Sequence, residues 1–175
     1  VHKYGVQTQM GNQGHTFDGM YRIKEWVDAG IVGDVKEVIT WTNRPCAPWF
    51  IAPKKFPIPH EDAPKNVDWN LWQGPVKHRS FSREFVPTKW RSWWDYGCGA
   101  LGDIGCHTFD APFYVLGLGM PNKVTVEREE PPGPGFIPMK SVVTYHFPKR
   151  GDKPAVKMKW IEAGYEVPKP KRWDQ

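Results

Sequence analysis

Leucine, cysteine and long apolar runs are all scarce in this chain of 175 residues. Its four leucines are too few for a helix bundle or a coiled coil, because both architectures bury long apolar stripes. No run of 18 apolar residues is present, so the sequence predicts neither a transmembrane helix nor a membrane partner. The three cysteines are an odd number without a Cys-x-x-Cys spacing, which argues against a disulfide framework and against cysteine-bound zinc.

An excess of one charge is also missing from most of the chain. The net charge is +5, yet basic and acidic side chains balance over residues 1–139, and the whole excess lies in residues 140–175. There Lys157 and Lys159 alternate along an apparent strand, which is typical of a solvated sheet face. Nucleic-acid-binding proteins concentrate basic residues on their working face. The sequence therefore argues against a nucleic-acid partner.

Tryptophan and proline, in contrast, are abundant and concentrated in one segment. Residues 43–96 hold six of the ten tryptophans and eight of the eighteen prolines, with almost no periodic pattern. A structureless loop of that length is uncommon in a compact domain, and disordered segments are poor in aromatic residues. The pattern predicts an ordered insertion that packs over the rest of the domain.

The remaining sequence alternates between helical and strand-like patterns. A β-like run at residues 4–10 and a glycine turn precede an amphipathic helix, for which Thr16 is the expected N-cap. A second helix is expected within residues 99–119, where Pro112 must kink or end it. The fold class predicted is α/β (α+β), with a mostly antiparallel open sheet and helices on one face. The first helix is expected at residues 17–29, and strands at residues 35–42, 123–130, 141–147 and 155–163.

Residues 97–102 match the glycine-rich fingerprint of dinucleotide-binding loops. That fingerprint must follow a buried strand and precede an acidic residue about twenty positions further on, and neither condition is met. We therefore reject a phosphate-binding loop here. The glycines are explained either by a ligand that approaches the backbone closely or by a tight contact between this helix and the sheet.

Asp103 and His107 are four residues apart, so a helix places them on one face, and Asp110 extends this polar stripe. A carboxylate beside an imidazole can orient it for proton transfer near neutral pH. An ordinary surface ion pair and half of a metal site are the alternatives, and spacing alone does not decide between them. No metal site is predicted, because no third ligand is evident.

Trp90 and Arg91 come shortly before this helix. Aromatic faces above a polar cleft suit sugar rings, which offer C–H faces and hydroxyl edges. Burial in a core is the commoner fate of a single tryptophan, so both interpretations stay open.

Three stretches follow one another along the chain: TQMGNQGH at 8–15, VDWNLWQGP at 67–75, and WRSWWDYG at 90–97 running into GALGDIGCH at 99–107. In this order they resemble the Gfo/Idh/MocA oxidoreductases, more narrowly the larger bacterial type with a Trp-rich insertion. The similarity covers about residues 3–163.

The resemblance implies two domains. Residues 1–30 would be the end of a Rossmann domain with its linking helix, and residues 31–175 a substrate and oligomerisation domain that contains the insertion 43–96. The family's cofactor loop and Glu-Lys-Pro lysine would lie upstream, so the chain is expected to be part of a longer protein that is inactive without them. NAD or NADP is the implied cofactor.

The resemblance also implies roles for single residues. The family's Asp-x-x-x-His pair matches Asp103 and His107, with His107 as the acid/base acting on a sugar hydroxyl and Asp103 binding substrate or steadying the imidazole. Apart from the resemblance, the Trp-rich segment is expected to bring Arg91 and Trp90 to the edge of the Asp103–His107 cleft as substrate contacts, with His15 as a further one. Asn12 is the expected cofactor contact at the rim.

The function predicted is an NAD(P)-dependent oxidoreductase that acts on a sugar, a polyol or a related cyclic alcohol. Two alternatives are an NAD-dependent glycosidase that oxidises its substrate transiently and a non-catalytic carbohydrate-binding or scaffold protein. The expected partners are a small sugar-like substrate and a second copy of the chain, paired through the open sheet face. The expected compartment is the cytoplasm, with export by a twin-arginine signal as the alternative.

Overall fold

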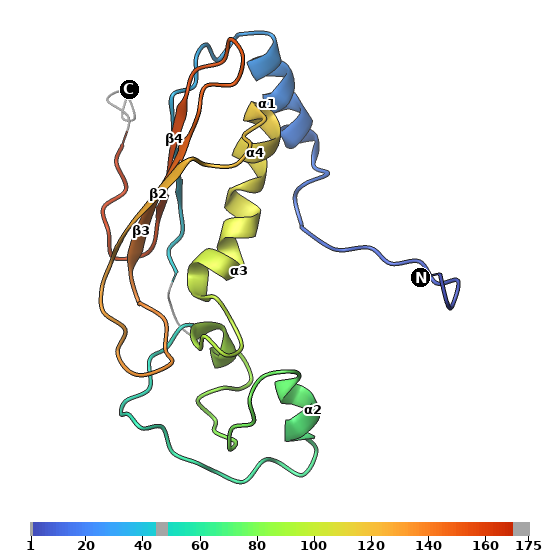
Figure 1. Cartoon of the computed structure of the whole chain (residues 1–175), viewed down its shortest axis with the longest axis vertical. Coiled ribbons are helices and arrows are strands. Elements are labelled where there is room, and N and C mark those ends of the chain that lie inside the picture. The colour runs from blue at the N-terminus through green and yellow to red at the C-terminus, as the bar shows by residue number, and fades with distance from the viewer. Residues whose placement is uncertain (1, 45–48, 170–175) are drawn as a thin grey trace.

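The computed structural model describes residues 2–44 and 49–169. A four-stranded sheet with the strand order β1-β4-β3-β2 forms one side of the molecule (Figure 1). β1 pairs with β4 in parallel, and the other two pairings are antiparallel, so the predicted open and mostly antiparallel sheet is confirmed. The strands are β1 (Glu37–Trp41), β2 (Lys123–Arg128), β3 (Ser141–Phe147) and β4 (Val156–Ile161).

The larger helices lie on one side of this sheet, as Figure 1 shows. Along β4 the side chains alternate: Val156, Met158 and Trp160 are buried, whereas Lys157 between them is exposed. This alternation gives the sheet one covered face, as predicted. The helices on it are α1 (Asp18–Asp28), α3 (Gly99–Thr108) and α4 (Asp110–Leu116).

The helix boundaries confirm some expectations and correct others. α3 ends and α4 begins around Phe109, and Pro112 lies in the first turn of α4, where its missing N–H would have pointed at Thr108. α1 forms where predicted, but Thr16 is not its cap. Phe17 takes that position, and no side chain caps the helix there.

The strand predicted at residues 4–10 is wrong. These residues form turns and irregular backbone, and they stretch away from the body of the molecule (Figure 1). A strand requires a neighbour whose N–H and C=O groups can pair with its own. No described strand lies next to this arm.

Two apolar clusters hold the domain together. One joins α4 and the segment after it to β3 and β4 through Val115, Leu116, Leu118, Phe147, Val156 and Met158. The other joins the Trp-rich segment to the sheet and to α3 through Phe50, Ile58, Trp69, Phe81, Phe85, Trp93, Ala100, Phe136, Ile137, Val143 and Trp160.

The Trp-rich segment therefore belongs to the core, as predicted, over its described residues 49–96. It contains little regular structure besides α2 (Trp69–Gln73) and the short 3₁₀ helix η1 (Lys89–Ser92). Trp69 and Trp93 are buried, whereas Trp72 and Trp94 keep 37% and 58% of their surface exposed. Core packing thus explains some of the tryptophans and leaves others at the surface.

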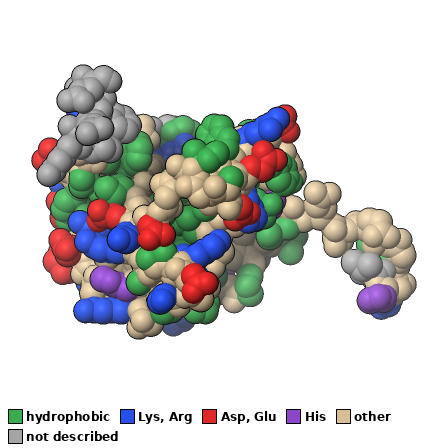
Figure 2. Space-filling view, turned by 90° about the horizontal axis from the view of Figure 1, so that it is seen from above, with side chains coloured by type: hydrophobic (Ala, Val, Ile, Leu, Met, Phe, Trp, Pro, Cys, Tyr) green, Lys and Arg blue, Asp and Glu red, His purple; other side chains and the backbone are tan. Residues whose placement is uncertain are grey.

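The surface carries charges of both signs close together. Figure 2 shows basic and acidic side chains interspersed on the face seen from above, with the N-terminal arm projecting from the body. Within the described part of the chain, no helix combines the length and the apolar character needed to cross a membrane.

Candidate active site

The glycines before and within α3 allow the chain to pack tightly against itself. A Cβ atom on Gly97 would lie 2.7 Å from the carbonyl oxygen of Arg91, and one on Gly99 would lie 2.6 Å from Cδ1 of Ile137. Gly99 also has a φ of +66°, a conformation that favours glycine. A Cβ atom at either position would collide with protein, so a tight internal contact explains both glycines.

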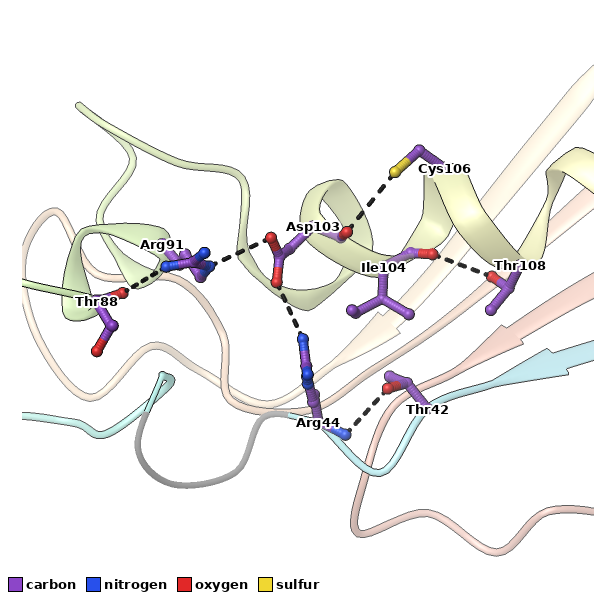
Figure 3. Close-up of polar contacts among 8 residues, drawn as sticks. All are labelled: Thr42, Arg44, Thr88, Arg91, Asp103, Ile104, Cys106 and Thr108. Atoms are coloured by element: carbon purple, nitrogen blue, oxygen red, sulfur yellow. Dashed lines mark hydrogen bonds and ion pairs between the residues drawn. The ribbon is translucent and has the colours of Figure 1, made fainter. Parts of the chain in front are cut away.

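This packing places Arg91 of η1 against Asp103 of α3. Arg91 donates from Nε to Oδ1 of Asp103 over 3.3 Å, and from Nη1 to the carbonyl of Thr88 over 3.3 Å. A second guanidinium approaches the other carboxylate oxygen, because Arg44 Nη1 lies 3.2 Å from Oδ2 of Asp103. Figure 3 shows Asp103 between the two arginines.

The backbone of Arg44 is fixed by two hydrogen bonds. Its N–H donates to Oγ1 of Thr42 over 3.2 Å. Its carbonyl accepts from the N–H of Ala163, just past β4, over 2.9 Å. The side chain therefore projects from the end of the sheet toward α3.

His107 lies one turn after Asp103 on α3 and is exposed. Across residues 2–44 and 49–169, no side chain or backbone group hydrogen-bonds its ring, and Asp103 turns to the arginines instead. The ordinary ion pair between Asp103 and His107 is therefore not formed. Among the described residues there is also no group of three or more His, Cys, Asp or Glu residues placed to hold a metal ion.

The loop before α1 lies against the same helices. Asn12 Nδ2 donates to the carbonyl of Cys106 over 3.4 Å. His15 Nδ1 lies 2.8 Å from Oδ2 of Asp110, and its ring packs edge-on against Tyr114 at 5.5 Å between centroids. The structure thus brings the two predicted rim residues next to the α3–α4 junction, and Asn12 reaches the residue immediately before His107.

The ring of Trp90 packs against the guanidinium of Arg91. The Cζ atom of Arg91 lies 4.5 Å from the centroid of the indole, a distance typical of a cation–π contact. Trp90 also lines a separate cavity of about 390 Å³ together with Trp72, Pro75 and Tyr96. Its contact in this structure is therefore to Arg91, and any stacking on a sugar ring stays a prediction.

Comparison with protein families decides the affiliation of the chain. Residues 19–143 match the family described as "Oxidoreductase family, C-terminal alpha/beta domain" of the Gfo/Idh/MocA group. The chain belongs to the Gfo/Idh/MocA oxidoreductase family. No curated protein matches its sequence.

The region matched to the Gfo/Idh/MocA family begins inside α1, ends inside β3 and contains Asp103 and His107. Members of the family are generally oxidoreductases that use NAD(P). The mixed α/β architecture agrees with the C-terminal domain named in the match.

The sequence patterns did not single out Arg44 of this Gfo/Idh/MocA chain. It lies 59 positions before Asp103 and follows β1 in a loop without periodicity. The sequence feature that could have pointed to Arg44 is its place just beyond the end of a strand, where loops often carry functional side chains. This feature does not predict that Arg44 contacts Asp103.

Proposed function

We propose that this chain is the substrate-side part of an NAD(P)-dependent oxidoreductase that acts on a sugar, a polyol or a related cyclic alcohol. His107 would remove the hydroxyl proton during oxidation and return it during reduction. One observation carries the proposal. The imidazole is exposed on α3 with no polar partner in the described chain, while the nearby acidic side chains Asp103 and Asp110 are both paired. An imidazole without a partner in the described chain is open to exchange a proton with a ligand.

The family description names a C-terminal domain, and this supports a division of labour within the protein. We assign residues 1–30 to the end of the dinucleotide-binding domain and its linking helix, and residues 31–175 to the substrate domain. The cofactor, when bound, supplies the hydride acceptor or donor. The glycines at residues 97 and 99 serve tight internal contacts, and we assign the cofactor phosphates to residues outside the 97–102 stretch.

Each remaining residue has a role that agrees with its contacts. Arg91 would bind substrate hydroxyls, since its guanidinium is held by Asp103 and backed by Trp90. Asp103 acts as a positioning residue for the arginine, because its carboxylate does not contact the imidazole of His107. Asn12 and His15 would border the site on the cofactor side, because both are bonded to the α3–α4 segment.

The test is the His107→Ala variant of the full-length gene product, assayed with NAD and with NADP on a panel of sugars and polyols. The turnover number should fall by about 10²–10⁴-fold, the usual contribution of a positioned acid/base group. Cofactor affinity should barely change. His60→Ala is the matched control, because His60 is exposed on the Trp-rich segment and should leave turnover unaltered.

An unchanged turnover number in His107→Ala would refute the assignment of His107. Release of free sugar from a glycoside without net formation of reduced cofactor would replace the proposed reaction with glycoside cleavage. Sugar binding without any turnover of the unsubstituted protein would identify a carbohydrate-binding protein instead.

A further inference from the structure

Two arginines share one carboxylate at this site and keep hydrogen-bond donors to spare. Arg44 reaches Asp103 through a single nitrogen, Nη1, and Arg91 reaches it through Nε alone. Neither contact is the two-pronged arrangement that an arginine can form with a carboxylate. Each guanidinium carries five N–H groups. The Nη2 groups of Arg44 and Arg91 make no hydrogen bond within the described chain, so they are available to another acceptor.

The charges of Arg44, Arg91 and Asp103 do not cancel. Arg44 and Arg91 bring two positive charges and Asp103 brings one negative charge. The nearest carboxylates along the chain have other partners: Glu84 pairs with Lys89, Asp95 with Arg79 and Asp110 with His15. These three side chains by themselves therefore carry one excess positive charge, and they are about three-quarters buried and thus less screened by solvent than surface charges.

Both guanidinium groups are held in place by aromatic rings. The Cζ atom of Arg44 lies 4.4 Å from the centroid of the Trp49 ring, and that of Arg91 lies 4.5 Å from the centroid of the Trp90 ring. A guanidinium that is already ordered loses little rotamer freedom when it binds a planar anion. The two arginines thus form a prepared anion-binding pair, on the side of α3 that presents Asp103.

We infer that the substrate carries a carboxylate group, and that Arg44 and Arg91 together bind it one helical turn from His107. The substrate class is then a sugar acid rather than a neutral sugar. A carboxylate fits better than a phosphate ester, because a single excess positive charge neutralises a monoanion and leaves a dianion with one charge unpaired. This inference rests on the proposed function, and it adds Arg44 as a specificity-determining residue.

The inference is tested by titrating the chain with D-glucuronate and D-galacturonate, with the matching neutral sugars, and with D-glucose 6-phosphate. Isothermal calorimetry measures the affinities. At least one uronate should bind about tenfold or more tightly than its neutral counterpart, as expected for hydrogen bonds to a charged group. Its affinity should also fall as salt is added.

Variants at Arg44 test whether Arg44 and Arg91 cause the preference for the uronate. Arg44→Met should remove most of the preference for the uronate, because it should lower the affinity for the uronate by a much larger factor than the affinity for the neutral sugar. Arg44→Lys should restore part of the preference, because it keeps the charge and loses the planar fork. Arg83→Met is the control, since the Arg83 side chain is 79% exposed and pairs with Glu61 away from this site. Far-UV circular dichroism of each variant checks the fold. If Arg44→Met does not fold, the comparison of ligands on the unsubstituted chain and on Arg44→Lys decides.

The inference is wrong if no uronate binds more tightly than its neutral counterpart, if D-glucose 6-phosphate binds most tightly, or if Arg44→Met keeps the full preference. These results are separate from a failure of the proposed function. Turnover of neutral sugars without a preference for uronates would overturn the inference alone. A preference for uronates that depends on Arg44, with turnover unaffected by His107→Ala, would overturn the proposed role of His107 and keep the anion-binding pair.

Discussion

The two halves of the core satisfy their backbone groups in different ways. In the sheet half, the strand ladders pair the carbonyl and N–H groups, and apolar side chains pack on the covered face. In the Trp-rich half, which lacks strands over its described residues, backbone groups pair in turns and in an isolated bridge, and tryptophan side chains also donate to backbone carbonyls. Nε1 of Trp69 reaches the carbonyl of Arg79 over 2.7 Å, and Nε1 of Trp93 reaches that of Glu84 over 2.8 Å.

This difference shows how a segment without periodicity can still be a fixed part of a fold. An indole combines a large apolar surface with one donor, so a single residue both fills the core and satisfies a carbonyl that no ladder pairs. The candidate site lies between the two halves. Arg44 comes from the end of the sheet, Arg91 from the Trp-rich half, and Asp103 from the helix between them. Its geometry therefore depends on the halves folding as one unit.

The largest effect is expected from Trp93→Ala, which tests whether the two halves of the core unfold together. Trp93 is 1% exposed, and its ring packs against Phe56, Phe85 and Phe136. Truncation of a buried aromatic costs about 3–5 kcal/mol, so the urea midpoint should fall sharply. Because Trp93 belongs to the shared core, the sheet should unfold in the same single transition, observed by far-UV circular dichroism.

Trp94→Ala is the control for this experiment. Trp94 is the next residue and is 58% exposed, so its removal should change the free energy of unfolding by no more than about 0.5 kcal/mol. Two separate transitions in Trp93→Ala would show that the Trp-rich half unfolds independently of the sheet, contrary to the comparison.

An intermediate effect is expected from Asp68→Ala. Oδ1 of Asp68 accepts from the N–H of Leu71 over 3.0 Å and so caps α2, the one α-helix described in the Trp-rich half. Loss of such a cap costs about 0.5–2 kcal/mol in free energy of unfolding. Chemical denaturation measures it, and Asp62→Ala, at an exposed position of the same segment, should cost less. Equal stabilities of the two variants would mean that α2 does not depend on its cap.

The smallest effect is a dependence on pH at the point where the two halves meet. Glu162 is 5% exposed, and burial raises the pKa of its carboxyl above the ordinary value, although hydrogen bonds with Ser141 and Trp160 oppose the shift. It lines a cavity of about 500 Å³ with Arg128 and Leu101. No ion pair joins Glu162 to a basic residue in the described chain.

The sign follows from this raised pKa. The folded state holds the Glu162 proton more tightly than the unfolded state. The contribution of this carboxyl to the free energy of unfolding is therefore fully present below about pH 4.3, and it is lost as the pH rises through the folded pKa. Glu162→Gln does not titrate. The free energy of unfolding of the unsubstituted chain, relative to this variant, should therefore fall as the pH rises from 4 to 7 in urea titrations. A difference that is constant with pH would contradict the raised pKa.

The sequence predicted the periodic parts of this fold well and the irregular parts poorly. α1 and the strands follow from apolar spacing, and the interruption between α3 and α4 follows from Pro112, because these signals are local. Residues 4–10 carry a strand-like pattern and still form no strand, because pairing depends on a neighbour that local sequence does not specify.

The candidate site, too, could be predicted from the sequence only in part. Asp103 and His107 could be placed on one helix from their spacing, and Arg91 was singled out by its place beside Trp90 just before that helix. The contact of Asp103 with Arg44 could not be predicted, because it joins residues from separate elements through a segment without a period. The role of His107 as an acid/base stays a prediction.

The pairing of β1 with β4 has a consequence for synthesis in the cell. Oγ1 of Thr40 donates to the carbonyl of Lys159 over 3.0 Å, across 119 positions of sequence. β1 is synthesised before the other strands of the sheet, and its partner β4 is synthesised after them. The nascent chain therefore cannot complete its sheet until residue 161 has left the ribosome. Contacts of such long sequence separation slow folding. Until then, the apolar residues of β1 lack the neighbouring strand that they pair with in the folded chain.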